Sequence, residues 1–581
     1  MAPRLVVSYG RARAIHVGLV CLSFITIFFL LRLYVTDYNP FRRSIYRTTE
    51  GKTSGPWKDE WSSVKHKSPQ STNEIEIDVP KADPDVLAYL RTLAQNHALS
   101  DEISWTARRT QPKYSPASNH QHSPPSLTET KTPLFEPHAF LRTPIATLSD
   151  ANPPPTTSSH PKPLSLPMLL PHLPSSIDAS PLLIAVSTTH ARLTHANNTL
   201  MHDWARWLTD GRGSSNGAAL VAVLHGASPA EVDAARDGLR KLGVDVDVSA
   251  SPEGGGDRGD RWARLVQALV IRRVGEPSGR AWFGIVDDDV FLPRVGRLLG
   301  MLGRGEGRGY VGVPSERGDW EEDGGRVRTV GGGVVFMTAG MVDVVGQLLC
   351  LQEPNGRSRL GEKGWDARLF ECVVEKTQDV DLRVLPGLYN PEDADEDMSV
   401  YGSHKVVSSQ TGYGSGVQPL ALHHYRNYHR LEAGKGHIVA SLCGEDCFLQ
   451  RFLFKDGWVL VNGYTITQYL QGARAVPLAK QKHQNSKPVA VGERLIIDKE
   501  DIPGQNEKTV AWKGHKKTWR LFDSVARENG EVWQAYINRK GGDNSVSGDI
   551  SERIPGSVVH GSDEEKADVD SVIIVIWEPV R

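Results

Sequence analysis

The chain has 581 residues, of which 39% are hydrophobic and 23% charged, enough for one large domain or two ordinary ones with tails. Its formal net charge of -2 argues against a nucleic-acid partner held by a basic surface. The 36 prolines and 55 glycines are unevenly placed, which indicates long unstructured parts.

An apolar segment lies close to the N-terminus. Residues 14–31 are apolar apart from three side chains, and the apolar character resumes after Arg32 as far as residue 35. This length approaches the ~20 residues with which a helix crosses a bilayer. Bulky and basic residues follow in place of a cleavage site, so we expect a retained signal anchor over 14–35 behind a cytoplasmic tail over 1–13. Arginines flank both sides, but the short tail and the large C-terminal part favour a lumenal catalytic domain.

Residues 36–180 have the composition of a stem. Proline, serine and threonine runs such as Pro153-Pro154-Pro155 cannot bury enough apolar area to offset chain entropy. We therefore expect this region to be largely disordered and to hold a catalytic domain away from the membrane. Residues 85–98 have helical spacing behind Asp83 and Pro84, and we interpret them as a transient helix without a role.

Regular alternation of strands and helices begins at residue 181. Short apolar runs predict buried strands, and segments with apolar residues on one face predict helices between them. The expected strands are 182–186, 218–224, 244–248 and 281–286, and the expected helices are 199–208, 229–242 and 260–274. This order predicts an α/β fold over 181–440, with a Rossmann-type, mostly parallel sheet and helices on both faces. Ligands bind such sheets at the carboxyl ends of the strands.

The acidic triplet Asp287-Asp288-Asp289 follows the last of these strands. Three consecutive carboxylates repel one another, so folding disfavours them unless a cation lies beside them. A hard divalent cation prefers oxygen ligands and can bridge diphosphate oxygens. An acidic, solvated turn is the alternative, but the apolar strand before the triplet and Phe291 just after it bury its surroundings. The pattern favours a metal site that binds a nucleoside diphosphate.

Further motifs surround the triplet in a fixed order. They are Ile184 to Thr189, His202-Asp203-Trp204, Arg280-Ala281-Trp282-Phe283, Tyr310-Val311-Gly312, Ser315-Glu316 and Gly331-Gly332-Gly333-Val334. Together with the triplet they resemble the Fringe-related β1,3-glycosyltransferases, glycosyltransferase family 31. The resemblance covers about residues 182–428, under half of the chain. The glycines alone are weak evidence, but their order behind the triplet is specific.

The resemblance implies a GT-A-type fold and an inverting transfer of a hexose or N-acetylhexosamine from a UDP-sugar. It also implies a glycan or glycoprotein acceptor, a β1,3 linkage, Mn²⁺ as the divalent metal and a Golgi membrane location. Asp289 would ligate the metal, and a late histidine would be the second ligand. His423 and His424 are the candidates, and we prefer His424, because the family histidine is commonly followed by an apolar or aromatic residue. The implied donor-binding residues are Thr188, Thr189, Asp287, Asp288, Gly332 and Gly333.

An inverting transferase also needs a base that takes the proton of the acceptor hydroxyl. The family places an aspartate at a helix start after the glycine-rich strand, and Asp366 fits that position. Two adjacent acids are common there in the family, whereas here Trp365 precedes Asp366. A purely structural N-cap is the alternative role for this aspartate.

The last part of the chain, 441–581, has a different pattern. Strand-like runs lie at 448–454, 458–461, 519–522 and 572–577, separated by polar stretches. We expect a small β-rich unit that covers the catalytic core or binds the acceptor glycan. Cys443 and Cys447 lie four apart and can close a small disulfide loop, and Cys350 and Cys372 a larger one. The spacing is poor for a zinc site.

Three functions are therefore weighed. The first is an active metal-dependent glycosyltransferase. The second is an inactive lumenal carbohydrate-binding or scaffold protein with the same fold, for which the single acid at Asp366 leaves room. The third is a lumenal phosphohydrolase, which would need dispersed carboxylates and histidines that the sequence does not offer.

Overall fold

The computed structural model describes most of the chain after residue 82. The described residues are 83–115, 127–136, 139–148, 162–169, 173–251, 258–275, 279–312, 333–348, 365–377, 381–385, 388, 407–408, 419–423, 425–426, 430–477, 495–497, 508–512, 514–541 and 568–580. All of them belong to one compact unit, Asp78–Arg581. None of the helices in these ranges combines the length and the apolar character needed to cross a bilayer. The predicted signal anchor, residues 14–35, lies outside the described residues.

An eight-stranded sheet forms the first layer of the fold, in the order β19-β12-β10-β11-β8-β5-β6-β7. Its strands are β5 (Leu182–Thr188), β6 (Ala219–His225), β7 (Asp245–Ser251), β8 (Trp282–Asp287), β10 (Gly309–Gly312), β11 (Val334–Thr338), β12 (Asp381–Val384) and β19 (Leu495–Ile497). Strands β5 to β8 are parallel, and β11 runs antiparallel to both neighbours. The chain moves from β5 outward to β7 and then returns to β8 on the other side of β5. The strand order thus reverses between β5 and β8, at the kind of position where α/β sheets bind ligands.

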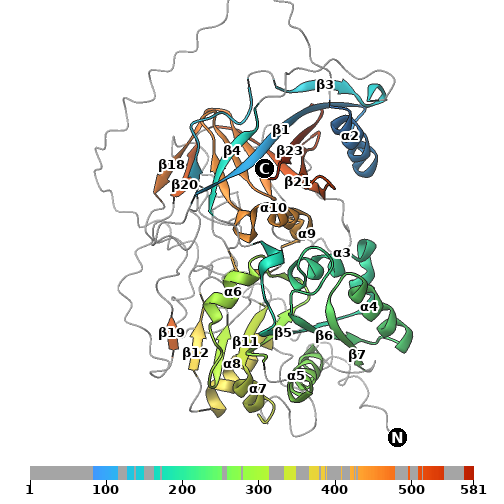
Figure 1. The fold of residues 1–581 in the computed structure, drawn as a ribbon, viewed down its shortest axis with the longest axis vertical. Helices are drawn as coiled ribbons and strands as arrows, with labels where there is room; N and C mark the ends of the chain where they lie inside the picture. The colour runs from blue at the N-terminus through green and yellow to red at the C-terminus, as the bar shows by residue number, and fades with distance from the viewer. Residues whose placement is uncertain are drawn as a thin grey trace, which may run out of the picture. The chain divides into compact units, whose positions relative to one another are not determined.

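Helices cover both faces of this sheet, as the sequence predicts. Helices α3 (His190–Leu208), α4 (Pro229–Lys241) and α6 (Val295–Leu302) pack on one face, and α5 (Arg258–Gly275), α7 (Ala339–Val345) and α8 (Trp365–Lys376) on the other (Figure 1). The alternation of β5 explains the two layers. Ile184 and Val186 enter the first core and Ala185 the second, because successive side chains of a strand point to opposite faces.

Capping residues fix where the helices of the first face begin. Ser228 precedes α4, and its side chain and that of Glu231 form a reciprocal capping box. Thr189 caps α3, because its hydroxyl accepts a hydrogen bond from the backbone N–H of Arg192. The start of α3 therefore lies directly after the carboxyl end of β5.

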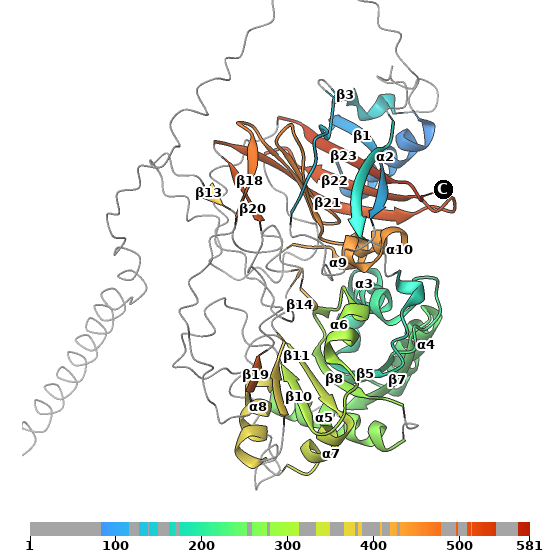
Figure 2. The ribbon, with the colours of Figure 1, turned by 60° about the vertical axis from the view of Figure 1, so that its left-hand side comes forward.

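A second, ten-stranded sheet combines segments from both ends of the chain. Its order is β2-β15-β16-β17-β21-β22-β23-β1-β3, and β4 also pairs with β1. These strands are β1 (Glu102–Ser115), β2 (Thr128–Glu129), β3 (Leu141–Pro144), β4 (Leu164–Leu169), β15 (Arg451–Leu453), β16 (Trp458–Val461), β17 (Thr465–Tyr469), β21 (Lys516–Ala526), β22 (Val532–Asn538) and β23 (Asp570–Trp577). Strand β1 runs parallel to β23 over eight residue pairs, from Ile103 opposite Asp570 to Thr110 opposite Trp577 (Figure 2).

The structure differs here from the expected disordered stem over 36–180. Residues 83–115 form helix α2 (Pro84–His97) and strand β1, and β3 and β4 join the same sheet. Helix α2 is not a transient element, because Leu90 and Leu93 are fully buried against the face of the sheet that contains Trp533 and Ile574. The parts of the predicted stem in 36–82, 116–126 and 149–161 lie outside the described residues.

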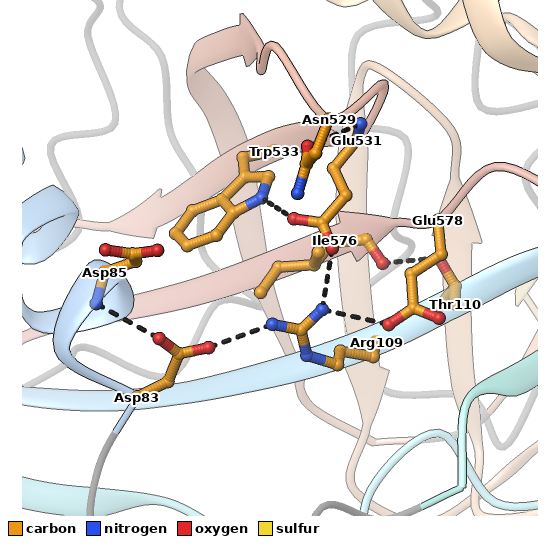
Figure 3. Close-up of polar contacts among 9 residues, drawn as sticks. All are labelled: Asp83, Asp85, Arg109, Thr110, Asn529, Glu531, Trp533, Ile576 and Glu578. Carbon is orange, nitrogen blue, oxygen red and sulfur yellow. Dashed lines mark hydrogen bonds and ion pairs between the residues drawn. The ribbon is translucent and has the colours of Figure 1, made fainter.

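Arg109 of β1 joins the N-terminal and C-terminal segments of this sheet. Its guanidinium lies 2.9 Å from carboxylate oxygens of Asp83, Glu531 and Glu578 (Figure 3). Asp83 also accepts a hydrogen bond from the N–H of Asp85, so the same side chain caps α2. One arginine thus ties the start of α2 to β1 and to residues that flank β22 and β23. A guanidinium suits this role because it has five donors in a fixed plane.

Two small sheets and a disulfide lie outside the two large sheets, as do the short helices α9 (Ala433–Gly436) and α10 (Ala440–Cys443). Strand β20 (Lys508–Trp512) pairs with β13 (Val407–Ser408) and β18 (Ala473–Pro477), and β14 (Leu422–His423) pairs with β9 (Val290–Phe291). Cys443 and Cys447 form the small disulfide loop that their spacing predicts. Cys372 is disulfide-bonded as well.

Candidate metal and donor site

The acidic triplet lies at the point where the strand order reverses. Asp287 is the last residue of β8, and its pairing partner on β5 is Ser187. The strand before it is buried from Trp282 to Val286, and the three carboxylate side chains are only 13–23% exposed. A solvated acidic turn would leave them open to water, so the alternative reading of the triplet does not hold.

Three side chains converge here and form a group that can hold a divalent metal. Ligand atoms of Asp287, Asp289 and His423, hereafter the three-ligand group, all lie within 4.8 Å of one another. The Nε2 atom of His423 is 3.6 Å from Oδ2 of Asp287 and 3.4 Å from Oδ1 of Asp289. Two carboxylates and one imidazole are a donor set that suits borderline and hard divalent cations. The residues present therefore fit a bound metal.

A short strand pair brings His423 to the acids from far along the chain. In the β9–β14 pair, His423 lies opposite Val290, which directly follows the triplet. The sequence favoured His424 as ligand, but His424 lies outside the described residues, and the histidine that the structure places beside the acids is His423. Neighbouring residues of a strand point to opposite faces. The sequence alone therefore could not decide between the two histidines without knowing the pairing of β14.

Asp288 is not part of the three-ligand group and contacts the end of β5 and the start of α3. Its Oδ2 accepts a 2.6 Å hydrogen bond from the hydroxyl of Thr188 and lies 2.9 Å from Nε of Arg192. Burial raises the pKa of the Asp288 carboxyl, and the charge of Arg192 opposes that rise. Thr189 supports this arrangement, because its hydroxyl accepts from the N–H of Arg192. The structure thus brings Thr188, Thr189 and Asp288 together beside the three-ligand group.

Gly333 lies directly against two residues of the three-ligand group. Its carbonyl accepts a 2.8 Å hydrogen bond from the N–H of Asp287, and its φ is +60°. A Cβ at this position would lie 2.9 Å from both Oδ2 of Asp287 and Nε2 of His423. A side chain here would therefore meet two of the three ligands as well as strain the backbone. Gly332, the other predicted glycine, lies outside the described residues.

Helix α8 contributes the candidate base. The helix begins at Trp365, and the next residue, Asp366, is 4% exposed. The indole N–H of Trp365 donates a 3.0 Å hydrogen bond to Oδ1 of Asp287. Burial raises the pKa of the Asp287 carboxyl well above its usual range; His423 lowers it, and the charges of Asp289, Asp366 and Asp288 raise it further. A cation bound among these carboxylates would offset the repulsion between their negative charges.

Helix α3 contacts both the segment that follows His423 and the acidic triplet. Asp203, 3% exposed, accepts hydrogen bonds from the hydroxyl of Tyr425 and from the guanidinium of Arg426, two and three residues after His423. The next residue of the helix, Trp204, donates from its indole to the carbonyl of Asp288 at 3.4 Å. The sequence grouped Asp203 and Trp204 in one motif but gave them no role. Their partners lie 222 and 84 residues away, so no local signal could have indicated them.

No protein-family model matches the sequence, and no curated protein matches it. Solved structures with a detectable similarity include a nucleoside-diphosphate-sugar pyrophosphorylase from Vibrio cholerae RC9, with 9% identity, a TM-score of 0.24, and coverage of 35% of this chain and 91% of that chain. A 4-diphosphocytidyl-2C-methyl-D-erythritol synthase from Anaerococcus prevotii has 11% identity and a TM-score of 0.22, and the match covers 36% and 88% of the two chains. Mouse xyloside xylosyltransferase 1, apo form, has 13% identity and a TM-score of 0.21, with 35% and 84% covered. Scores this low leave the function of this chain to be argued from its own residues.

Proposed function

We propose that the protein is a metal-dependent inverting glycosyltransferase of the Fringe-related, GT-A type. It would move a hexose or N-acetylhexosamine from a UDP-sugar to a glycan or glycoprotein, forming a β1,3 linkage by analogy with the family. The observation that carries the proposal is the convergence of Asp287, Asp289 and His423 at the reversal point of the sheet. The sequence resemblance supplies the donor class and the stereochemistry.

The residues divide into metal ligands and donor contacts. Asp287, which the resemblance assigned to the donor, would join Asp289 and His423 in holding the cation, with Mn²⁺ the expected metal. When bound, the cation neutralises the diphosphate that leaves with the nucleoside. Thr188 and Asp288 lie directly beside this group and are placed to contact the donor's sugar or ribose hydroxyls. Gly333 keeps the approach to the ligands free of a side chain.

Asp366 is the proposed base. The acceptor oxygen forms a bond to the anomeric carbon as the bond from that carbon to the diphosphate oxygen breaks, and UDP leaves. The proton of the acceptor hydroxyl passes to the Asp366 carboxylate. Asp366 is 4% exposed, and its charge acts on the Asp287 carboxyl, so it lies close to the proposed metal ligands. The same environment would keep water from competing with the acceptor.

The proposed location is the Golgi lumen, with the chain anchored by residues 14–35. Two observations support an oxidising compartment and a membrane anchor: the Cys443–Cys447 disulfide and the apolar N-terminal segment of the sequence. An inactive carbohydrate-binding or scaffold protein remains the second candidate, since Asp366 is a single acid where the family often has two.

Release of UDP separates the two candidates. The full-length protein is incubated with a panel of UDP-sugars, with Mn²⁺ or with a chelator, and free UDP is measured. We expect release from at least one donor only with the metal, and at least 100-fold less from Asp289→Ala. Asp233→Ala, on an exposed position of α4, is the matched control and should keep full activity. Turnover of Asp289→Ala equal to wild type, or no UDP release from any donor, would refute the proposal.

A further inference from the structure

Trp365 occupies an unusual place for a core aromatic residue. It is 7% exposed and belongs to the core between the eight-stranded sheet and helices α5, α7 and α8. Its one polar atom, the indole N–H, points out of this core to Oδ1 of Asp287 at 3.0 Å. An indole N–H can only donate, so it bonds this oxygen as an acceptor. A residue that serves packing alone would not need to reach a metal ligand.

The carboxylate of Asp287 is fixed by its neighbours on several sides. The backbone N–H of Asp287 donates a 2.8 Å hydrogen bond to the carbonyl of Gly333, which fixes the position of the backbone. Oδ1 accepts from Trp365, while Oδ2 lies 3.6 Å from Nε2 of His423. The two oxygens therefore have different partners: Oδ1 binds the indole, and Oδ2 lies toward His423.

The negative charge of the surrounding carboxylates favours an uncharged donor at position 365. Four carboxylates already lie close together, those of Asp287, Asp288, Asp289 and Asp366. An acid at position 365 would add a fifth negative charge, whereas the indole gives a hydrogen bond without charge. It also orients the carboxylate in the absence of the cation, so less freedom is lost when the cation binds.

We propose that Trp365 is a positioning residue that orients Asp287 and so sets the metal affinity of the three-ligand group. The proposal rests on the metal site in the proposed function. Groups that orient metal ligands typically contribute about 10- to 100-fold in affinity. Replacing the indole by phenylalanine should keep the aromatic packing and remove only the donor.

Trp282 offers a matched control on the same strand that ends at Asp287. It is 4% exposed and donates its indole N–H to the carbonyl of Gly303 at 2.9 Å, at the amino end of β8. Trp282→Phe therefore also loses one buried indole hydrogen bond, but at the end of the strand far from the ligands. Equal losses of thermal stability with unequal losses of metal affinity would separate positioning from packing.

The test is Mn²⁺ binding to the full-length protein, followed by electron paramagnetic resonance of the free ion, with no sugar donor present. We expect the Kd to rise about 10-fold or more in Trp365→Phe and to stay at the wild-type value in Trp282→Phe. If Trp365→Phe failed to fold, benzothienylalanine at position 365, which replaces N–H by sulfur at nearly the same shape, should give the same rise.

Two results would overturn the proposal, and they are distinguishable. A wild-type Kd in Trp365→Phe, with Asp289→Ala greatly weakened, would refute the role of Trp365 and leave the metal site standing. Wild-type protein that binds Mn²⁺ no better than Asp289→Ala would refute the metal site and, with it, the role of Trp365.

Discussion

The carboxylate of Asp203 accepts a hydrogen bond from the hydroxyl of Tyr425, 222 residues later in the chain. Tyr425 is 1% exposed and lies two residues after His423, so this bond ties the strand that carries the histidine to helix α3. The same carboxylate binds Arg426, and a Cβ at Gly434 would come within 2.1 Å of its Oδ1. Asp203 therefore anchors the segment that brings the imidazole to the acids.

Asp203→Ala should weaken both the fold and the metal site. It leaves the Tyr425 hydroxyl and the Arg426 guanidinium without their shared acceptor, a loss of about 2–3 kcal/mol in the free energy of unfolding. Mn²⁺ affinity should fall as well, because the position of His423 is no longer fixed. Denaturant unfolding and metal titration measure the two effects. Tyr425→Phe removes only one of the two donors and should show a smaller loss of both; a variant of Asp203 with unchanged metal affinity would contradict the anchoring role.

The sequence predicts the parts of the site that depend on local patterns. The apolar run before the acidic triplet was sufficient to place the triplet at a strand end, and the start of a helix at Asp366 agrees with α8 to within one residue. Residues whose partners are distant escaped prediction. Which histidine faces the acids depends on the register of β14 against β9, and register between distant segments leaves no local signal.

The dependence on distant partners also explains why strand β1 was not predicted within the expected disordered stem. In β1, Ile103, Trp105 and Ala107 alternate with more polar residues, but a long polar and proline-containing context concealed this strand. Its partner β23 is more than 450 residues away, and both strands are needed before either apolar face is buried. Composition can show that a segment cannot fold alone, but not that it completes a sheet elsewhere.

Gly333→Ala should abolish metal binding. The added Cβ would lie 2.9 Å from Oδ2 of Asp287 and from Nε2 of His423, and a left-handed backbone adds about 1–2 kcal/mol of strain. Gly307→Ala is the matched control, because its φ is +73° but nothing lies within 4 Å of the added atom. We expect similar losses of thermal stability in the two variants and loss of Mn²⁺ binding only in Gly333→Ala. Equal metal affinity in both would show that the space in front of the ligands is not required.

Glu445 should make the fold less stable as the pH rises. Its carboxylate accepts bonds of 3.0 Å from the N–H groups of Val295 and Gly296 at the start of α6, yet burial outweighs these and raises its pKa to about 8. An ordinary glutamate in the unfolded chain titrates near 4.5. Between these values the folded state binds more protons, so stability is full below pH 4.5 and is lost up to pH 8, at no more than about 1.4 kcal/mol per pH unit.

Urea unfolding at pH 5, 6.5 and 8 measures this dependence. In Glu445→Gln no proton is bound or released at this position, so the free energy of unfolding should decline less between pH 5 and 8. Asp233→Asn, an exposed carboxyl on α4, should leave the decline unchanged. The assignment fails if the wild-type protein gains stability from pH 5 to 8, or if Glu445→Gln declines as steeply as wild type.

A chain that starts at residue 181 should not fold, although the predicted catalytic domain begins there. Its loss of β1 would turn β23 into an edge strand whose eight residues are buried in the complete protein. Its loss of α2 would uncover Trp533 and Ile574, and its loss of Arg109 would leave Glu531 and Glu578 without their shared cation. An exposed apolar edge of this kind pairs with other copies, so we expect aggregation. A chain that starts at residue 78 keeps all of these contacts and should be soluble and monodisperse in size-exclusion chromatography; a soluble, cooperatively unfolding chain from residue 181 would contradict the role given to the N-terminal strands.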